Sequence, residues 1–312
     1  MFIAKTIMNF IRIPKSIWQS LKRRYLRCFA SPKELADFLY YMQFGQHINW
    51  QHPEDLNQWI NWLAFNTDTT EWSRLADKYT VREYVKECGL KNILVPLYAV
   101  WETPEDINFD SLPDGFVLKA NNGCGDVRII KDKTKVNIEE IRKYFTKLFS
   151  HPFGKDGAEP HYLRIPPKII AEELLDTTKQ SLSSTSLIDY KVWCINGVPV
   201  LNFVCLNRTK EHMTIDCYDT NWQRKDWMLN YGKHYIPNSR PLPKPNHLAD
   251  ILKYATILSK PFPQARIDLY EVDEKVYFGE ITFTSACGRM DYFTSEALKM
   301  LSKNINMINS HD

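Results

Sequence analysis

The sequence predicts an α+β fold in which the sheets are mostly antiparallel. Two observations lead to this class. Apolar segments with the spacing of strands follow one another across short turns, most clearly in residues 187–206, where Asn196-Gly197 supplies a two-residue hairpin turn. Predicted helices do not alternate regularly with strands, so a βαβ architecture is not expected. The 312 residues are enough for two or three modules around a sizeable core.

Helices are predicted where apolar residues recur at helical spacing between start and stop signals. In residues 31–45, Ser31 is placed as the N-cap and Glu34 as the acid that completes a capping box. In residues 80–89, Thr80 is expected to cap in the same way, and the final glycine to end the helix. Further helices are expected over residues 54–65, 138–150, 248–258 and 295–301.

Strands are predicted where short apolar runs are bounded by turn residues. Besides the hairpin already described, they are expected in residues 95–101, on both sides of a glycine-rich loop within 116–132, and over 168–175, 213–218 and 265–283. The last segment is a second predicted hairpin, and it carries charged residues that an apolar hairpin does not need.

Composition excludes several classes of protein. The 40 basic and 37 acidic residues give a net charge of +3, which argues against a dedicated nucleic-acid surface. The seven cysteines include no C-x-x-C pair, so a reducing, cytoplasmic compartment is expected instead of a secreted disulfide framework. No apolar run approaches the roughly 18 residues that indicate a membrane span.

The first 30 residues differ from the rest of the chain, because they contain seven Lys and Arg residues and no acidic residue. On the C-terminal side of Pro14, apolar residues recur at helical spacing at Ile17, Trp18, Leu21 and Tyr25. Two interpretations stay open. The segment is either an arm that lies on the anionic inner face of a membrane, or a helix packed on the domain with a solvated basic face.

Four polar residues make the hairpin at 265–283 unusual. Because side chains alternate along a strand, Arg266 and Asp268 share one face of the first arm. Glu280 and Thr282 likewise share one face of the second arm. Whether the two faces coincide depends on the length of the turn.

The turn decides which residues pair. A two-residue turn at 273–274 would place Asp268 opposite Gly279 and put Glu280 on the far side of the sheet. A three-residue turn at 273–275 would instead place Asp268 opposite Glu280. It would also place Arg266 opposite Thr282. We predict the three-residue turn.

Paired carboxylates need a counter-charge, since two of them about 4 Å apart repel by roughly 4 kcal/mol at an effective dielectric constant near 20. A divalent cation held by Asp268 and Glu280 would offset this repulsion, and Mg²⁺ prefers few carboxylates together with substrate phosphates. The alternative is a structural salt bridge between Arg266 and one acid, with the other acid facing water.

The segment FVLKANNGCGD, residues 116–126, delivers Lys119 into a loop that contains Gly123 and Gly125. Glycines let backbone N–H groups approach a phosphate closely, and the lysine adds a positive charge. The loop lacks the Gly-Lys-Ser/Thr of a Walker A motif and the third glycine of a dinucleotide fingerprint. An ordinary glycine turn between two strands is the alternative.

Other polar residues are ambiguous on their own. The apolar strand at 168–175 contains Glu172 and Glu173 near its end. These acids either accept hydrogen bonds from the ribose hydroxyls of a purine nucleotide or face solvent. Lys191, in the middle of a strand, faces phosphate if it points inward and solvent if it points outward. Lys78, just before a helix, has the same two interpretations.

Several common catalytic patterns are missing from the sequence. It contains no H-E-x-x-H or Cys/His zinc spacing and no G-x-S-x-G elbow. It also contains no Asp-x-Asp, which disfavours a metal-dependent nucleotide-sugar transferase.

The order of these signals resembles one family. Four segments are similar to the TupA-like ATP-grasp family, which is associated with teichuronopeptide and surface-polysaccharide gene products: DKYTVREYVKECG, FVLKANNGCGDVRIIKDK, DYKVWCINGVP and RIDLYEV…VYFGEITF. The resemblance runs from about residue 72 to about residue 290 and leaves the basic arm outside.

The resemblance implies two α+β lobes that clasp ATP between antiparallel sheets, preceded by a helical region. It implies three catalytic residues, with Lys119 and Lys191 on the nucleotide phosphates and Arg266 on the transferred phosphoryl group. The nucleotide-binding residues that it implies are Lys78, Lys119, Gly123, Gly125, Glu172, Glu173, Leu175 and Lys191.

The resemblance also implies that Asp268 and Glu280 hold Mg²⁺. Thr282 stands where many ATP-grasp enzymes supply a further metal ligand from asparagine, and a hydroxyl is the weaker ligand. The glycine loop at 123–125 is a candidate lid. Arg208 is either a clamp for the carboxylate of an acceptor or a surface arginine.

The implied activity is ATP-dependent ligation of a carboxylate to an amine, through an acyl phosphate. The expected substrates are a uronic-acid sugar of capsule or O-antigen polysaccharide and an amine or amino acid. Two alternatives stay open: a glycosyltransferase of surface-polysaccharide synthesis, and a non-catalytic nucleotide-binding scaffold at the membrane.

Four regions are expected along the chain. They are a basic amphipathic arm at 1–30, an N-terminal helical α/β region at 31–115, a small ATP-grasp lobe with the glycine loop at 116–170, and a large lobe with the metal site at 171–312.

Overall fold

The computed structural model describes residues 15–305, so the part of the predicted basic arm before Lys15 lies outside the described residues. The α-helices are α1 (Lys15–Phe29), α2 (Pro32–Phe44), α3 (Leu56–Asn66), α4 (Thr70–Ala76), α5 (Val81–Glu87), α6 (Ile138–Phe149), α7 (Leu248–Ser259) and α8 (Ser295–Ser302). Short 3₁₀ helices are η1 (Lys91–Ile93), η2 (Pro104–Asp106), η3 (Lys133–Lys135), η4 (Tyr162–Arg164), η5 (Thr177–Lys179), η6 (Asp226–Met228) and η7 (Ser285–Gly288).

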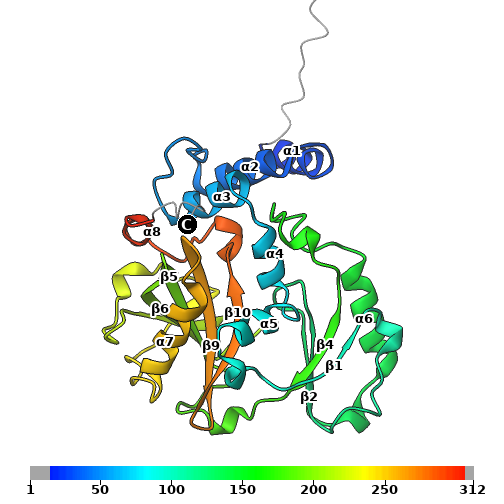
Figure 1. The fold of residues 1–312 in the computed structure, drawn as a ribbon. Coiled ribbons are helices and arrows are strands. Elements are labelled where there is room, and N and C mark those ends of the chain that lie inside the picture. Colours follow the sequence, from blue (N-terminus) through cyan, green and yellow to red (C-terminus); the bar gives the residue numbers. More distant parts are fainter. Residues whose placement is uncertain (1–14, 306–312) are drawn as a thin grey trace, which may run out of the picture.

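The strands form two sheets beneath the layer of helices α1–α3 (Figure 1). They are β1 (Leu97–Trp101), β2 (Phe116–Ala120), β3 (Val127–Ile130), β4 (Ile169–Glu173), β5 (Asp189–Ile195), β6 (Val198–Leu206), β7 (Met213–Tyr218), β8 (Tyr235–Pro237), β9 (Gln264–Val272) and β10 (Lys275–Thr282). Within the described residues, one sheet has the order β1-β4-β2-β3 and the other β10-β9-β5-β6-β7-β8. Neighbouring strands are antiparallel except β7 and β8, which confirms the predicted fold class.

Side chains cap the starts of α2, α3, α6 and α8, whereas α4, α5 and α7 start without a side-chain cap. The Glu34 N–H donates to Ser31 Oγ at 3.3 Å, and the Ser31 N–H donates to the Glu34 carboxylate at 2.8 Å, which confirms the capping box. Asp55 caps α3. The cap predicted at Thr80 is wrong, because this residue has helical torsion angles and its hydroxyl donates to the carbonyl of Arg74.

The four-stranded sheet draws its strands from distant parts of the chain. β1 comes before the predicted boundary at residue 115, β2 and β3 follow it, and β4 spans the predicted boundary at residue 170. α6 packs on this sheet through a core that includes Phe116, Phe145 and Ile169. The residue limits of the four regions stay predictions.

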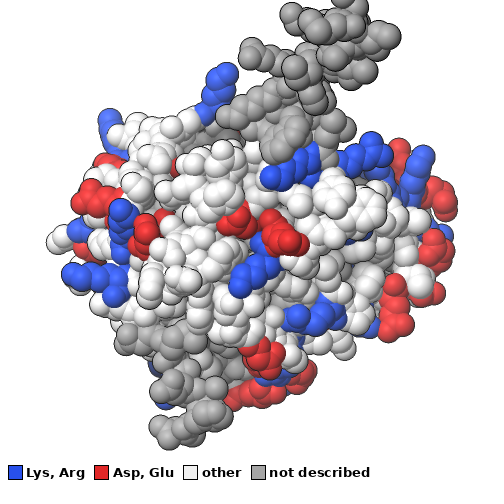
Figure 2. Space-filling view, turned by 90° about the horizontal axis from the view of Figure 1, so that it is seen from above, with Lys and Arg blue, Asp and Glu red and all other residues white. Residues whose placement is uncertain are grey.

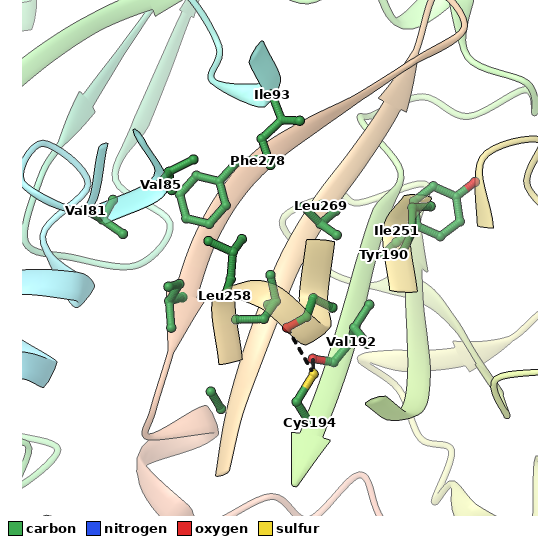
Figure 3. Close-up of a cluster of buried hydrophobic side chains, with 14 of the residues drawn as sticks. Val81, Val85, Ile93, Tyr190, Val192, Cys194, Ile251, Leu258, Leu269 and Phe278 are labelled. Atoms are coloured by element: carbon green, nitrogen blue, oxygen red, sulfur yellow. Dashed lines mark hydrogen bonds between the residues drawn. The ribbon is translucent and has the colours of Figure 1, made fainter. Parts of the chain in front are cut away.

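One face of the six-stranded sheet packs on α7 through an apolar core. Tyr190 and Val192 of β5 and Leu269 of β9 enter a core that also contains Ile251 and Leu258 of α7 (Figure 3). Because side chains alternate along a strand, the residues between these positions point to the opposite face of the sheet. That opposite face, called the polar face below, carries the charged residues of the predicted site next to a second apolar core that includes Trp193, Phe203 and Ile215.

The β9–β10 hairpin reaches the predicted pairing by another route. Asp268 lies opposite Glu280, and Arg266 lies opposite Thr282, as predicted. The predicted three-residue turn is wrong, because the turn contains only residues 273–274, each with φ of 54°, and strand pairing resumes directly after it.

A β-bulge at Gly279 supplies the residue that the turn does not. Before the bulge, Val276 and Phe278 point into the apolar core, and after it Ile281 does. The inward positions of β10 therefore change from even to odd numbers at the bulge. Without this change, the alternation would place Glu280 in the apolar core.

Close packing explains why glycine occupies the bulge. A Cβ atom on Gly279 would lie 3.0 Å from the backbone oxygen of Asp268 and 3.0 Å from the ring of Tyr270. Neither the backbone of a central strand nor a packed aromatic ring can move away without disturbing its own neighbours.

Replacing Gly279 with alanine should lower the free energy of unfolding by about 1–3 kcal/mol, because the atoms around the added methyl group must shift. Denaturant unfolding measures the change. Gly232→Ala is the matched control, since a Cβ atom there meets nothing within 4 Å. Equal stability of the two variants would contradict the packing argument.

Candidate functional site

Cross-strand pairing places five of the predicted site residues in two rows on the polar face of the six-stranded sheet. Lys191 on β5, Asp268 on β9 and Glu280 on β10 lie directly opposite one another. The next row contains Trp193, Arg266 and Thr282. Residues from two distant segments of the chain therefore meet because of the register of three neighbouring strands.

Arg266 connects the two acids. Its Nε and Nη2 lie 2.7 and 2.8 Å from the two carboxylate oxygens of Asp268, which is a bidentate pair. Nη2 also lies 3.4 Å from Glu280 Oε1 and 3.0 Å from Thr282 Oγ1. The guanidinium lies 5.5 Å from the ring centroid of Trp193. Arg266 thus holds both acids on the same side of the sheet.

The ionic contacts continue beyond this pair. Lys191 Nζ donates to the carboxylate of Asp268 and lies 3.2 Å from Asp189 Oδ2. Asp189 also accepts a hydrogen bond from Arg208, which ties this arginine into the site. We call the resulting series of alternating charges the ion-pair chain: Arg208, Asp189, Lys191, Asp268, Arg266, Glu280 and Lys78.

The central members of the ion-pair chain are largely buried, and the attraction between neighbouring charges outweighs the cost of burial. The side chain of Asp268 is 1% exposed, and those of Arg266 and Lys191 are 11% and 13% exposed. Burial alone would raise the pKa of Glu280, but the charges of Lys78, Lys191 and Arg266 outweigh it and lower the pKa to about 2. Burial alone would lower the pKa of Lys191, yet the carboxylates around it hold the pKa above its usual value. At neutral pH both side chains are therefore charged.

A second charged cluster lies on the four-stranded sheet around Glu172 of β4. Its Oε2 is 2.6 Å from Lys119 Nζ on β2, and its Oε1 is 3.1 Å from Arg82 Nη1 on α5. Arg82 also donates to the carbonyl of Val95 at 2.8 Å. Two residues of the predicted nucleotide site, Lys119 and Glu172, thus pair with each other.

The glycine loop between β2 and β3 is joined to the ion-pair chain through Lys78. Its Nζ donates to the carbonyl of Gly123 and lies 3.5 Å from Glu280 Oε2. The buried side chain of Asn121 fixes the base of the loop through hydrogen bonds. Gly125 has φ of 80°, a conformation that favours glycine.

Glu173 and Leu175 lie where the two sheets meet. Leu175 packs in an apolar cluster with Val95 and Val272, and Tyr270 packs against this cluster. Tyr270 is on the same face of β9 as the aspartate of the ion-pair chain, two positions further along. Glu173 is half-buried at the end of β4. An apolar wall therefore adjoins the charged face of the sheet.

The model of one protein family, described as TupA-like ATPgrasp, matches residues 58–306. The chain belongs to the TupA-like ATP-grasp family. This match confirms the resemblance found in the sequence and gives the two-sheet architecture its name, the ATP-grasp fold.

Solved structures similar to this ATP-grasp chain include the D-alanine–D-alanine ligase from Bacillus anthracis complexed with ATP, at 15% identity and a TM-score of 0.40, covering 67% of this chain and 55% of that one. The D-alanine–D-alanine ligase from Helicobacter pylori matches at 15% identity and a TM-score of 0.39, covering 79% and 62%. The ATP-grasp ligase PsnB with its minimal precursor matches at 11% identity and a TM-score of 0.39, covering 78% and 64%. The chain thus spans less than two thirds of the length of these three. Among curated proteins, none matches it.

Two acids and a hydroxyl of this ATP-grasp chain could hold a divalent cation at the predicted place. Asp268 and Glu280 both contact Nη2 of Arg266, at 2.8 and 3.4 Å, so their carboxylates lie on the same side of the sheet. Glu280 Oε1 is 3.4 Å from Thr282 Oγ1, which adds a hydroxyl. Residues 15–305 contain no group of three or more His, Cys, Asp or Glu that could hold a metal. Two carboxylates suit Mg²⁺ that is bound together with substrate phosphates.

Three residues of the ATP-grasp site are absent from the sequence-based prediction. Asp189 is two positions from Lys191 on the same face of β5, so strand alternation could have identified it. Ser285 Oγ lies 3.1 Å from Nη1 of Arg266, but Ser285 belongs to the irregular turn after β10, which the sequence does not indicate. Arg82 is 90 positions from its glutamate partner, and no local pattern relates the two.

Glu280 should make the stability of the protein depend on acid pH. Its pKa is about 2 in the folded chain, against a usual value of 4.5, so the unfolded chain takes up the proton first as the pH falls. The stability that Glu280 contributes is present above pH 4.5 and is lost as the pH approaches 2. In this window, Glu280→Gln should reduce the slope of unfolding free energy against pH by up to roughly 1.4 kcal/mol per pH unit.

Urea unfolding at a series of pH values measures this slope. Glu211→Gln, at an exposed position, is the matched control and should leave the slope unchanged. A slope in Glu280→Gln equal to that of the unsubstituted protein would contradict the electrostatic assignment.

Proposed function

We propose that this ATP-grasp protein is an ATP-dependent carboxylate–amine ligase that works with Mg²⁺. The ion-pair chain is the observation that carries the proposal. It places two carboxylates suited to a cation beside several cations suited to phosphates, on one face of one sheet. Mg²⁺ is positively charged and the triphosphate of ATP is negatively charged. The acidic side chains could therefore exchange their present partners for Mg²⁺, and the basic side chains could exchange theirs for phosphate oxygens.

The proposed nucleotide site follows the junction of the two sheets. The apolar cluster around Leu175 offers a wall for the adenine ring, and Glu173 lies next to it as an acceptor for ribose hydroxyls. Lys119 and Lys191 would contact the phosphates from the two sheets. Glu172 would keep Lys119 in position through the 2.6 Å contact described above.

The proposed reaction has two steps. An oxygen of the substrate carboxylate attacks the γ-phosphorus of ATP, the bond to ADP breaks, and an acyl phosphate forms. The nitrogen of the amine then attacks the acyl carbon, inorganic phosphate leaves, and the nitrogen loses a proton to give the amide.

The side chains contribute positioning and charge to these steps and form no covalent bond. Arg266 and Lys191 stabilise the negative charge on the transferred phosphoryl group. Mg²⁺ held by Asp268 and Glu280 would neutralise phosphate charge. The glycine loop at 123–125 would cover the site, which matters because an acyl phosphate hydrolyses in contact with water.

The substrate class is a finer part of the same proposal. We propose that the carboxylate belongs to a uronic-acid sugar of a capsule or O-antigen polysaccharide and that the nucleophile is an amine or amino acid. The support is the association of the TupA-like family with teichuronopeptide and surface-polysaccharide gene products.

Formation of ADP should require Mg²⁺, a uronic-acid substrate and an amine together, and the coupled product should weigh one water less than the two substrates. Asp268→Asn and Glu280→Gln should each lower the rate by at least about 100-fold, as expected when a preorganised charge at a reaction centre is removed. A coupled ADP assay and mass spectrometry over a panel of uronates and amines make the measurement.

Glu105→Gln, at an exposed position, is the control and should keep the full rate. ADP formation that survives both acid substitutions would remove the metal assignment. Transfer of sugar from a nucleotide diphosphate without ATP would identify a glycosyltransferase. ATP binding without turnover over the whole panel would support a scaffold instead.

A further inference from the structure

The N-terminal arm, residues 1–30, differs in charge from the rest of the protein. It holds seven of the 40 basic residues and none of the 37 acidic residues, so the remainder of the chain has more acidic than basic side chains. Figure 2 views the molecule from the side of α1 and shows basic and acidic side chains interspersed on the described part of this face. The excess of positive charge therefore belongs to the arm and not to the face beneath it.

One side of α1 attaches the arm to the domain. Leu26 packs against a cluster that contains Leu35 and Phe38 of α2. Arg27 Nε lies 3.2 Å from Asp156 Oδ1. These contacts fix the C-terminal half of α1 on the domain and so decide which of its side chains remain outside.

The outward side of α1 carries aromatic rings next to a cation. Tyr25 is 61% exposed and Phe29 is 76% exposed. They are one helical turn apart, with ring centroids 5.2 Å from each other. Arg24 is exposed as well. A helix that served only to pack on the domain would turn such rings inward, so their position indicates a partner with apolar and anionic parts.

We propose that α1 docks this protein on an anionic lipid bilayer, with Tyr25 and Phe29 among the headgroups and the basic residues on the lipid phosphates. Aromatic rings favour the boundary between headgroups and acyl chains, and an acid-free basic segment is attracted to anionic lipid. A purely ionic partner would leave the exposed ring pair unexplained. None of the helices in residues 15–305 is long and apolar enough to cross a membrane.

The helical layer that carries α1 also holds the end of the candidate site. Asn61 of α3 donates to the carbonyl of Gly288 at 3.0 Å, and Gln43 of α2 donates to the carbonyl of Arg289 at 3.1 Å. These carbonyls belong to the turn after β10, which begins with the serine that contacts Arg266. Docking through α1 would therefore hold this end of the site toward the bilayer.

Vesicle flotation of the full chain without nucleotide tests the proposal. The protein should float with vesicles of an equal mixture of phosphatidylcholine and phosphatidylglycerol, and should not float with phosphatidylcholine alone. Tyr25→Ser/Phe29→Ser should abolish binding. Arg24→Ser should lower the partition coefficient about fivefold, the contribution of one cation near an anionic surface.

Tyr98→Ser on β1 and Lys143→Ser on α6 are matched controls at exposed positions and should bind as the unsubstituted protein does. Failure of the unsubstituted protein to bind anionic vesicles would overturn the proposal, as would unchanged binding in the α1 variants. A dimer that forms without lipid and is dissolved by Tyr25→Ser/Phe29→Ser would assign this surface to a second copy of the chain. Because no nucleotide is present, these outcomes are independent of the proposed ligase activity.

Discussion

The bulge at Gly279 in β10 changes which residues of the strand point into the apolar core. Val276 and Phe278 fill the core on one side of it, and Ile281 does so on the other. The change of phase releases Glu280 to the polar face, where it meets an aspartate that never leaves the regular register of β9. The remaining members of the two rows lie where ordinary strand alternation places them. The site thus depends on a local irregularity in β10.

The ion-pair chain shows how a protein keeps so many charges in a partly buried place. Moving an ion from water into the protein costs several kcal/mol. This cost is offset only if the ion has a close partner of opposite charge and further hydrogen bonds. Every interior member of the ion-pair chain has an oppositely charged neighbour on both sides, so removing one leaves two others short of a partner. The alternation of charges also suits the binding of Mg²⁺ and nucleotide phosphates together. Each side chain can then exchange a contact with its neighbour for a contact with the ligand, and the number of ionic contacts is unchanged. Structural stability and the proposed binding of Mg²⁺ and nucleotide therefore depend on the same side chains.

Much of the fold could be predicted from the sequence, since its signals are local. The capping box at Ser31, the turn at Asn196-Gly197 and the glycine loop after β2 each depend on neighbouring residues. The pairing of Asp268 with Glu280 was predicted, but from the wrong cause, because a longer turn and a bulge have the same effect on register.

The switch from even to odd apolar positions in β10 is present in the sequence and would have located the bulge. What no local pattern indicates are the long-range contacts. Arg82 meets Glu172 only when α5 is placed against β4, and Ser285 meets Arg266 only through the irregular turn of η7. The helix α4 and the three-residue strand β8 were missed because both are too short to show a clear period.

We propose above all that Asp268 and Glu280 share one metal ion, and that this ion also binds the phosphates of the nucleotide. The most direct measurement is a crystal structure with Mn²⁺ and a non-hydrolysable ATP analogue, in which anomalous scattering locates the metal. We expect a Mn²⁺ peak bonded to one carboxylate oxygen from each of the two residues and to phosphate oxygens, with Arg266 and Lys191 turned toward the phosphates. A metal bound elsewhere, while both acids remain on Arg266, would contradict it.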